Sequence, residues 1–491
     1  MGALGKLLIQ KCISLEVLFC WDFLCYTLNM VQDVRVRIAP SPTGLFHIGT
    51  ARSSLFNYVF AKQNKGTFVL RIEDTDKERS KPEFEKSILD GLSMLGLKHD
   101  EFYRQSERTA IYRKYLEKLL SNGRAFWCNH DQAFLENEQK EQSSQKQAPR
   151  HICDQKGKAE SGEFKERSVI RLGVDAHSTE KIMFEDIVRG HVEFEARLVG
   201  DIVIAKDLST PLFHFVVVVD DYEMTISHVI RGEEHLANTP KHILLQRALE
   251  FSQPIYVHLP LILAPDRSKL SKRHGATSLT EYIEKGYLPE AVLNYLFLLG
   301  FSPPDGAEIL TLGEMIQCFD ITAVHKAGAI FDIKKLDWIN GEYIKKMSDS
   351  ELAKHLERFL RNVETSKLIG AVPLMRQRMK TLGYCKDFLY LFQQPEYEAL
   401  LLKWKKSDLN LSAKALAEVR MKLADIEFTS DSIRAVLEEV GVSAGERGLA
   451  YWPLRVALSG ASSSPDPIEL SLYFGKEEVI KRIDAALQKI S

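Results

Sequence analysis

The sequence predicts an α/β domain that is interrupted by an α+β insertion and followed by an all-α domain. Residues 35–79 have the pattern of a strand, a helix and a second strand, and similar patterns return at 211–265 after a polar stretch. From about residue 279 onward the chain has almost only helical patterns. Alternating strands and helices predict a parallel sheet with helices on its faces, here split by the insertion.

The first block begins with an alternating strand, Arg35–Ile38, followed by a turn that contains two prolines and a glycine. Proline fixes φ, and glycine allows a close approach to the backbone. A helix from about His47 to Gln63 would offer unpaired N–H groups at its N-terminus to an anion. A second strand, Thr67–Ile72, places Glu73 at its C-terminal end. This βαβ unit therefore has polar groups at its ligand-binding edge.

Shorter patterns supply the remaining elements. Ser80 and Glu83 have the spacing of a capping box, which predicts the start of a helix. Residues 131–165 are polar and repetitive, which indicates a solvated helix or loop in the insertion. The apolar, β-branched run Phe213–Val219 is expected to be a buried parallel strand. The other expected elements are a helix at 108–122, strands at 169–172 and 201–205, a helix ending at 246, a strand at 255–263, and helices at 290–299 and 351–359.

The composition is typical of a folded globular protein with several domains. Of the 491 residues, 45% are hydrophobic and 27% are charged, which excludes disordered and fibrous classes. The formal net charge of -2 gives no global signature of nucleic-acid binding, although a local basic patch would suffice. The 7 cysteines are scattered and odd in number, so we expect a reducing compartment, the cytoplasm, rather than a disulfide framework.

Residues 1–29 form an unusual leader. Their apolar stretch resembles a signal peptide, but Glu16 and Asp22 interrupt it and no small-residue cleavage pattern follows. The same acidic residues make a membrane span costly. Because Met30 stands just ahead of the first strand, we expect the leader to be an added or misassigned segment.

Two separated motifs point to nucleotide chemistry. In the first, His47-Ile48-Gly49, a histidine at a helix N-terminus can donate a hydrogen bond to charge that develops on a phosphate. The alternative is a histidine that only caps the helix. The second motif, Lys269–Arg273, lies on an expected loop. Alone it would indicate a solvated surface, but together with the first it indicates a mobile lid over a triphosphate.

These motifs resemble the two signatures of the class I aminoacyl-tRNA synthetases, and the chain is similar to the glutamyl-tRNA synthetases of the bacterial type. His47–Thr50 resembles the HIGH signature and Lys269–Arg273 the KMSKS signature. The resemblance extends from about Val34 to the C-terminus. It includes Arg71–Asp76, Val218–Asp221, Val229–Leu236, Pro453–Arg455 and Gly475–Glu477.

The resemblance implies a Rossmann-like class I synthetase catalytic domain split by an α+β insertion and followed by an all-α anticodon-binding domain. It also implies ATP-dependent attachment of L-glutamate to the 3' end of glutamate tRNA through a glutamyl-adenylate, with Mg²⁺ carried by ATP. The expected divisions are the leader 1–29, the first catalytic half 30–105, the acceptor-end-binding insertion 106–210, the second catalytic half 211–265, the lysine-motif loop and stem-contact region 266–340, and the anticodon-binding domain 341–491.

The resemblance assigns the glutamate site to Arg37, Ser41, Glu73, Phe213 and Arg231. A guanidinium matches a carboxylate bidentately, so the two arginines suit substrate glutamate, while Ser41 and Glu73 would engage its α-amino group. Without the resemblance, arginines paired with Glu73 or Glu233 would be the default interpretation. Phe213 departs from the family's tyrosine and lacks one hydrogen bond, worth roughly 0.5 to 1.5 kcal/mol.

The resemblance also assigns ATP binding and catalysis. The catalytic residues would be His47, Lys269 and Lys272. The expected ATP contacts are Pro40, Thr43, Gly44, His47, Gly49, Thr50, Ser271 and Lys272.

The insertion contains two close pairs of nitrogen and sulfur ligands. Cys128 and His130 precede the polar stretch, and His151 and Cys153 follow within it, so the four could complete a tetrahedral zinc site. Some relatives hold zinc with Cys-x-Cys and Cys-x-His, and many have no metal. Buried free thiols with an exposed histidine are the alternative.

Basic groups in the helical domain suit tRNA. Arg376 and Arg378 form a cluster with Lys380, and lysines at 403, 405 and 406 flank Trp404. A solvated helix face is the alternative for each. The rivals to glutamate tRNA charging are a glutaminyl-tRNA synthetase, a tRNA-modifying paralogue and a non-catalytic tRNA-binding protein. We expect a monomer without membrane contact, and leave open whether glutamine tRNA is also charged.

Overall fold

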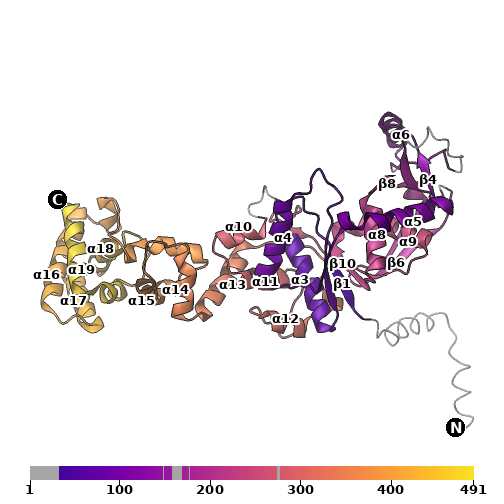
Figure 1. Ribbon diagram of the computed structural model, residues 1–491. Helices are drawn as coiled ribbons and strands as arrows, with labels where there is room; N and C mark the ends of the chain where they lie inside the picture. Colours follow the sequence, from indigo (N-terminus) through magenta and orange to yellow (C-terminus); the bar gives the residue numbers. More distant parts are fainter. Residues whose placement is uncertain are drawn as a thin grey trace, which may run out of the picture.

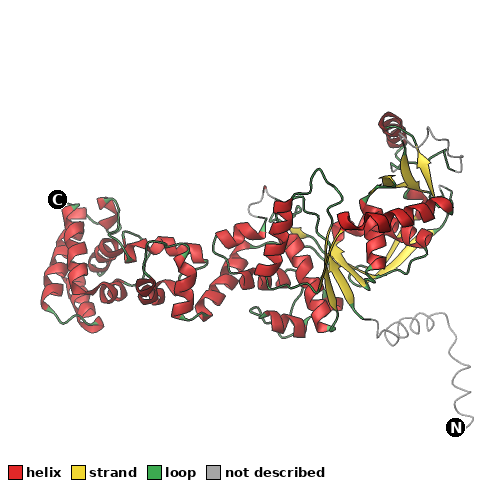
Figure 2. Ribbon diagram, viewed as in Figure 1, coloured by secondary structure: helices red, strands yellow, loops and turns green. Residues whose placement is uncertain are grey.

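The computed structural model describes residues 33–147, 149–156, 168–175, 177–271, 273 and 277–490. The leader at 1–29 and Lys272 lie outside these residues. The molecule is elongated, with the insertion at one end and the C-terminal helices at the other (Figure 1). Strands are found in the part that precedes residue 331, and the rest of the described chain is helices and loops (Figure 2). The expected order of an α/β part followed by an all-α part is confirmed.

The first half of the central sheet is the predicted βαβ unit with one further strand. Strands β1 (Arg35–Ile38), β2 (Thr67–Ile72) and β3 (Glu101–Arg104) are parallel. Helix α3 (Ile48–Gln63) connects β1 to β2, and α4 (Pro82–Met94) connects β2 to β3. Apolar side chains of the strands and of α3 are buried together, and this burial holds the layers in place.

The second half lies beside β1. Strands β10 (His228–Gly232) and β11 (Ile255–Leu259) are parallel and are joined through α9 (Thr239–Leu249). The backbone N–H of Ser227, just before β10, donates to the carbonyl oxygen of Arg35. The crossover helices of β1 and β10 therefore leave in opposite directions, and ligands bind at such a switch point outside the carboxyl ends of the strands.

The predicted strand at Phe213–Val219 is wrong. This segment is helix α8 (Phe213–Glu223), in which every residue from Phe215 to Asp221 is buried. A helix that is buried on all sides has no polar face, so its sequence has no helical period and reads like a buried strand. Packing against α9 and the insertion overrides the modest strand preference of its valines.

Two boundary predictions are also wrong. Ser80 and Glu83 form no capping box, because α4 begins at Pro82 after Lys81, which makes no side-chain cap. Proline is favoured in the first turn of a helix and sets this start. The expected strand at 255–263 is two strands, β11 and β12 (Ile262–Leu263), since Pro260 separates them and has no N–H for a ladder.

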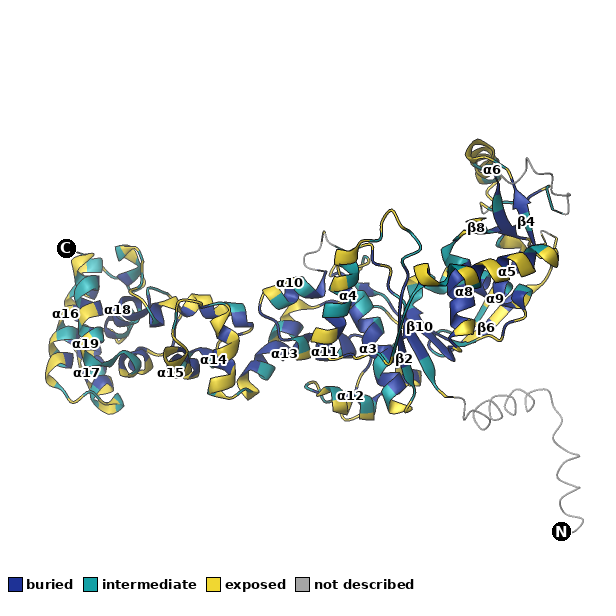
Figure 3. Cartoon of the chain, in the orientation of Figure 1, coloured by how far each residue is buried: buried dark blue, intermediate teal, exposed yellow. Residues whose placement is uncertain are grey.

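The insertion contributes two small sheets. Strands β4, β5, β8 and β9 form an antiparallel sheet, and β6 and β7 form a hairpin in which β6 pairs with β11 of the central sheet. Helix α6 has no buried residue, which confirms the predicted solvated helix (Figure 3). The bounds are α5 (Thr109–Ser121), β4 (Ala125–Cys128), α6 (Gln132–Ser144), β5 (Val169–Leu172), β6 (Lys181–Asp186), β7 (Gly190–Glu195), β8 (Ile202–Asp207) and β9 (Thr210–Pro211).

The C-terminal part is helical except for β13 (Ala329–Ile330), which pairs with β12. No helix among the described residues is both long enough and apolar enough to span a membrane. The helices are α10 (Leu279–Glu284), α11 (Pro289–Leu298), α12 (Leu312–Cys318), α13 (Ile333–Lys346), α14 (Asp349–Glu357), α15 (Thr365–Arg376), α16 (Leu409–Asp425), α17 (Ser430–Ser443), α18 (Gly448–Ser459) and α19 (Pro467–Gln488).

Candidate active site

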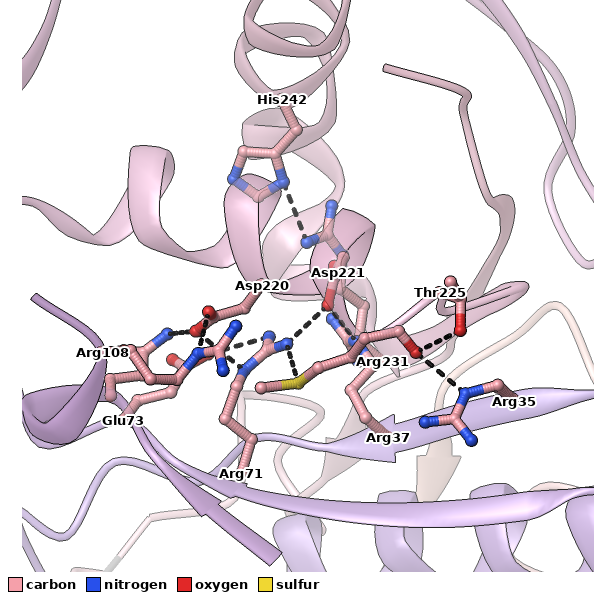
Figure 4. A network of polar contacts seen from close by, with 12 residues as sticks. Arg35, Arg37, Arg71, Glu73, Arg108, Asp220, Asp221, Thr225, Arg231 and His242 are labelled. Carbon is pink, nitrogen blue, oxygen red and sulfur yellow. Dashed lines mark hydrogen bonds and ion pairs between the residues drawn. The ribbon is translucent and has the colours of Figure 1, made fainter. Parts of the chain in front are cut away.

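A buried network of charges lies beneath the switch point (Figure 4). The Arg71 guanidinium lies 2.8 Å from Asp221, 3.4 Å from Glu73 and 3.8 Å from Asp220. Asp220 also accepts hydrogen bonds from Arg108 and Tyr112, at 2.7 Å each. Buried ions are costly unless they are paired in this way, so the network fixes the side chains around it.

Asp221 joins Arg71 to the cavity above. Its Oδ1 accepts from Arg71 and, at 3.0 Å, from Nε of Arg37. Burial alone would raise the pKa of Asp221, but Arg37 and Arg71 outweigh it and hold that pKa below its usual range. The carboxylate therefore stays ionised and anchors Arg37.

Glu73 has the opposite balance. Burial raises its pKa to about 7, although Arg71 and Arg37 both oppose the shift. A glutamate with such a pKa changes charge near neutrality, which is a frequent property of binding and catalytic carboxylates.

Arg231, at the end of β10, has no carboxylate partner among the described residues. Its Nε donates to Nε2 of His258 at 3.1 Å, its Nη2 to the hydroxyl of Thr239 at 2.8 Å, and its Nη1 lies 3.2 Å from Nδ1 of His242. Burial and then the nearby Arg37 lower the pKa of Arg231 to about 10, so the side chain remains charged at neutral pH.

These groups open into a cavity of about 240 Å³. All five residues that the resemblance assigns to glutamate, namely Arg37, Ser41, Glu73, Phe213 and Arg231, line this cavity. The structure thus brings together residues separated by up to about 190 positions. Their individual roles stay predictions.

A second cavity of about 270 Å³ adjoins the first and shares Gly49, Thr50, Ser53, Gly232 and Glu234 with it. It lies between His47 and Lys269. Of the other expected ATP contacts, Pro40 lines the first cavity, while Thr43, Gly44 and Ser271 line neither. Lys269 is 3.6 Å from Glu234, and Lys272 lies outside the described residues.

His47 is the N-cap of α3, as in the alternative interpretation of that residue. Its Nδ1 accepts from the backbone N–H of Gly49 at 3.0 Å. A neutral imidazole that accepts at Nδ1 carries its proton on Nε2. The cap therefore fixes the tautomer that can donate a hydrogen bond from Nε2, so capping and phosphate binding are compatible.

Several cavity residues were missed from the sequence. Val217, Ile230, Glu234 and His235 line the first cavity, and Glu234 faces both. Glu234 and His235 directly follow the strand that carries Arg231, and this position at the carboxyl end of a strand was the available signal. Val217 was hidden by the wrong assignment of α8.

The four expected zinc ligands converge in the insertion. Their ligating atoms lie within 4.8 Å of one another. Sγ of Cys128 is 3.6 Å from Nδ1 of His130 and 3.6 Å from Nε2 of His151, and Sγ of Cys153 is 3.6 Å from Nδ1 of His130. The two imidazole nitrogens are 3.2 Å apart. On its other side, His151 contacts Glu138 through Nδ1 at 2.6 Å.

The basic residues of the helical part have mixed environments. Arg376 pairs with Asp349, whereas Arg378 is exposed. Trp404 is half-buried against Trp452, and Nζ of Lys405 lies 4.5 Å from its ring centroid. These contacts leave both interpretations of the clusters open.

Comparisons with known proteins agree with this architecture. Residues 33–338 match the family model described as tRNA synthetases class I (E and Q), catalytic domain, and residues 351–487 match the model of an anticodon binding domain. The chain is 40% identical over 480 residues to glutamate–tRNA ligase 2 of Thermoanaerobacter pseudethanolicus, covering 94% of this chain and 99% of that protein. It is 40% identical over 479 residues to glutamate–tRNA ligase of Aquifex aeolicus, covering 94% and 100%.

A solved structure is similar over the same extent. The crystal structure of a glutamate tRNA ligase from Elizabethkingia meningosepticum in complex with its amino acid has a TM-score of 0.81. It is 32% identical in sequence, and the alignment covers 94% of this chain and 100% of that chain.

Proposed function

The chain belongs to the class I tRNA synthetases for glutamate and glutamine, and from this membership we propose that it is a glutamate–tRNA ligase. The observation that carries the proposal is the pair of adjoining cavities at the switch point. One contains two arginines and a glutamate, and the other lies between His47 and Lys269. An amino acid with a side-chain carboxylate fits the first, and ATP, entering with Mg²⁺, fits the second.

The first cavity suits glutamate because each of its groups has a counterpart. Arg231 and Arg37 would hold the side-chain carboxylate, and Glu73 with Ser41 the α-ammonium. The α-carboxylate is then directed toward the neighbouring cavity. Positioning of two reactants in this way supplies much of the rate enhancement of a reaction that needs no protein nucleophile.

Activation consists of one substitution at phosphorus. An α-carboxylate oxygen of glutamate forms a bond to the α-phosphorus of ATP while the bond to the pyrophosphate oxygen breaks. Nε2–H of His47 would donate to the phosphate oxygens as their charge develops. Lys269, with Lys272, would neutralise the departing pyrophosphate, and Lys269 must exchange its contact with Glu234 for the phosphates. A ribose hydroxyl of tRNA then displaces AMP from the glutamyl group.

The tRNA would contact both ends of the molecule. We assign the insertion, residues 106–210, to the acceptor end. We assign the helical domain to the anticodon arm, with contacts from the exposed Arg378 and from Arg376, which pairs with Asp349 in the structure. The region 266–340 would contact the stem between them. We propose a cytoplasmic location, in keeping with a role in translation. We also propose a monomer, because one chain carries every site that the reaction requires.

We infer that the Cys128, His130, His151 and Cys153 cluster holds a structural zinc ion. A tetrahedral zinc with Zn–S of about 2.3 Å and Zn–N of about 2.0 Å has N···S edges of about 3.5 Å and N···N edges of about 3.3 Å. The observed separations of 3.6 Å and 3.2 Å fit these edges. Glu138 would orient His151 as an outer partner. The ion would stabilise the fold of the insertion and takes no part in the chemistry.

The alternative is a glutaminyl-tRNA synthetase. The amino-acid cavity argues against it, because an amide cannot neutralise the guanidinium of Arg231 as a carboxylate does. A purely tRNA-binding paralogue would not need the adjoining cavity or the Nε2 donor of His47.

Exchange of radioactive pyrophosphate into ATP tests the proposal. We expect exchange that depends on glutamate and that requires added tRNA, since members of this family generally need tRNA for activation. Equal exchange without tRNA would contradict the tRNA requirement. Absence of exchange under both conditions would contradict the ligase assignment.

A further inference from the structure

A chain of hydrogen bonds leads from the insertion to the amino-acid cavity. Nδ1 of His258 lies 2.7 Å from Oδ2 of Asp186, and both residues are almost fully buried. Nε2 of the same imidazole accepts from Nε of Arg231. Asp186 ends β6 in the insertion, His258 lies on β11, and Arg231 lies on β10, so three neighbouring strands contribute one residue each.

The direction of each hydrogen bond in this chain is determined. A guanidinium can only donate, so Nε2 of His258 must be the acceptor and the proton must be on Nδ1. That proton is donated to Asp186. The Asp186 carboxylate also accepts from the backbone N–H groups of Val188 at 3.0 Å, Arg189 at 2.8 Å and His258 at 3.1 Å. Such a carboxylate is a rigid anchor, and it fixes both the tautomer and the ring orientation of His258.

A second branch holds the other side of the guanidinium. Nδ1 of His242 faces Nη1 of Arg231 and must accept from it, which leaves the His242 proton on Nε2, 3.2 Å from Nδ1 of His214. Burial lowers the pKa of both imidazoles, that of His214 to about 4, so both are neutral acceptors. The groups that hydrogen-bond to Arg231 are therefore all neutral.

The contrast with Arg37 shows what the arrangement achieves. Arg37 bonds directly to the Asp221 carboxylate, which neutralises much of its charge. The imidazole of His258 lies between Asp186 and Arg231, so Asp186 orients the guanidinium without contacting it. A buried cation without a direct anionic partner favours an anionic ligand strongly over a neutral one.

We propose that Asp186 and His258 are positioning residues that aim the Arg231 guanidinium into the amino-acid cavity and leave its charge to the side-chain carboxylate of the substrate. This inference rests on the proposed function. It assigns to the end of β6, in the insertion, a part in selecting glutamate over glutamine. Neither residue lines the cavity, so both act through Arg231.

The Asp186→Asn variant tests this role in the full-length protein. The change preserves size but removes the charge and one acceptor of the anchor. The glutamate KM in tRNA charging should rise about tenfold, as expected for a weakened hydrogen bond to a charged group, with the ATP KM and kcat within about twofold. The ratio of the inhibition constant of glutamine to the KM of glutamate, here called the inhibition ratio, should fall toward one. An unchanged glutamate KM and an unchanged ratio would overturn the proposal.

A matched control separates positioning from general destabilisation. Ser227→Ala removes a buried hydroxyl that bonds to Arg35, beside the same strand as Arg231 but away from the cavity. It should lower the thermal midpoint and leave the glutamate KM and the inhibition ratio unchanged. Equal changes of the glutamate KM in Ser227→Ala and Asp186→Asn would reduce Asp186 to a structural role and overturn the proposal.

If Asp186→Asn does not fold, two substitutions of His258 decide the question. Oε1 of the glutamine in His258→Gln can accept from Arg231, whereas His258→Ala has no acceptor. We expect the glutamate KM to be lower in His258→Gln than in His258→Ala, and equal values would overturn the proposal. The wild-type protein distinguishes failure of the positioning role from failure of the proposed function. If wild-type protein charges no tRNA with glutamate, the proposed function itself fails.

Discussion

Two buried arginines face the amino-acid cavity in different electrostatic states. Arg37 is paired with Asp221, whereas Arg231 contacts only neutral groups among the described residues. Arg231 therefore has the larger unsatisfied affinity for a carboxylate. Removing the Arg231 side chain should therefore weaken binding of the amino acid and leave binding of the nucleotide unchanged.

We expect Arg231→Ala to raise the glutamate KM by about 100-fold, because a desolvated charge pair is worth about 3 kcal/mol. The ATP KM should be unchanged. Arg231→Lys is the matched variant: it keeps the charge but loses the planar fork, so its glutamate KM should be intermediate. Steady-state charging kinetics measure both, and a glutamate KM unaffected by Arg231→Ala would reject the assigned role.

The shifted pKa of Glu73 predicts a pH dependence. Burial raises this pKa to about 7, so the side chain is protonated at lower pH and ionised at higher pH. Only the ionised form attracts the α-ammonium of glutamate. The glutamate KM should therefore rise as the pH falls, by up to about tenfold per pH unit once the pH is below the pKa. Kinetics between about pH 6 and pH 8 measure this.

The imidazole of His235 does not contribute to this pH dependence of the glutamate KM. Burial lowers the pKa of His235, which lines the same cavity, to about 4, so it stays neutral throughout this range. Glu73→Gln should bind glutamate weakly and show a flat profile. A profile in Glu73→Gln that still rises toward low pH would assign the titration to another group.

At the scale of single residues, the sequence predicted the charged lining of the cavity but not what supports it. Arg37 and Arg231 lie in strands, and Glu73 directly follows one, within motifs that are visible along the chain. Asp186, His242 and His258 contact Arg231 or its partners only because three strands and α9 pack together. No local pattern marks a histidine that meets an arginine 27 residues away.

His47, the N-cap of helix α3, would combine a structural and a chemical function. His47 caps the helix with Nδ1 and would serve ATP with Nε2. His47→Asn separates the two, because asparagine is a good N-cap but has no donor at the position of Nε2. We expect kcat to fall by about 100- to 1000-fold while the thermal midpoint changes little.

His47→Ala is the comparison variant, which loses the cap as well. It should show the same loss of kcat together with a stability loss of about 1 kcal/mol, measured by chemical denaturation. A His47→Asn protein with normal kcat would mean that the histidine is only a cap.

The insertion gives a metal prediction at the scale of an element. Purified protein should contain about one zinc per chain, and Cys128→Ser should reduce the zinc content and lower the thermal midpoint of the insertion. Cys318→Ser is the control, because Cys318 is a half-exposed free cysteine outside the cluster. Elemental analysis measures the content, and zinc-free wild-type protein of unchanged stability would contradict the assignment.

Element by element, the sequence predicted most of the secondary structure and failed where burial is complete. The βαβ unit was recognised from its two strand-like runs and the Pro- and Gly-containing turn between strand and helix, and α6 from its polar composition. Helix α8 has no helical period, since seven consecutive residues of it are buried, and its valines were assigned to a strand. Pattern reports which face meets water, and a segment without such a face cannot be assigned by pattern alone.

On the scale of the whole molecule, the candidate active site lies between the two ends that we propose to contact tRNA. Figure 1 shows the insertion and the helical domain at opposite ends of an elongated protein, with β1 and β10 between them. Strand β6 of the insertion pairs directly with β11 of the central sheet. Asp186 at the end of β6 is connected to Arg231 through a hydrogen bond to His258. The order of the domains along the chain was predicted from the sequence. The connection from Asp186 to Arg231 was not, because it depends on the pairing of strands that are distant in sequence.

Charging of purified tRNAs tests the central claim most directly. Glutamate tRNA and glutamine tRNA are incubated separately with the protein, ATP, Mg²⁺ and radioactive glutamate or glutamine. The account predicts glutamyl-tRNA from glutamate tRNA and no transfer of glutamine to either tRNA, while glutamyl transfer to glutamine tRNA would show relaxed tRNA selection. Transfer of glutamine, or no charging of any tRNA with glutamate, would contradict the account.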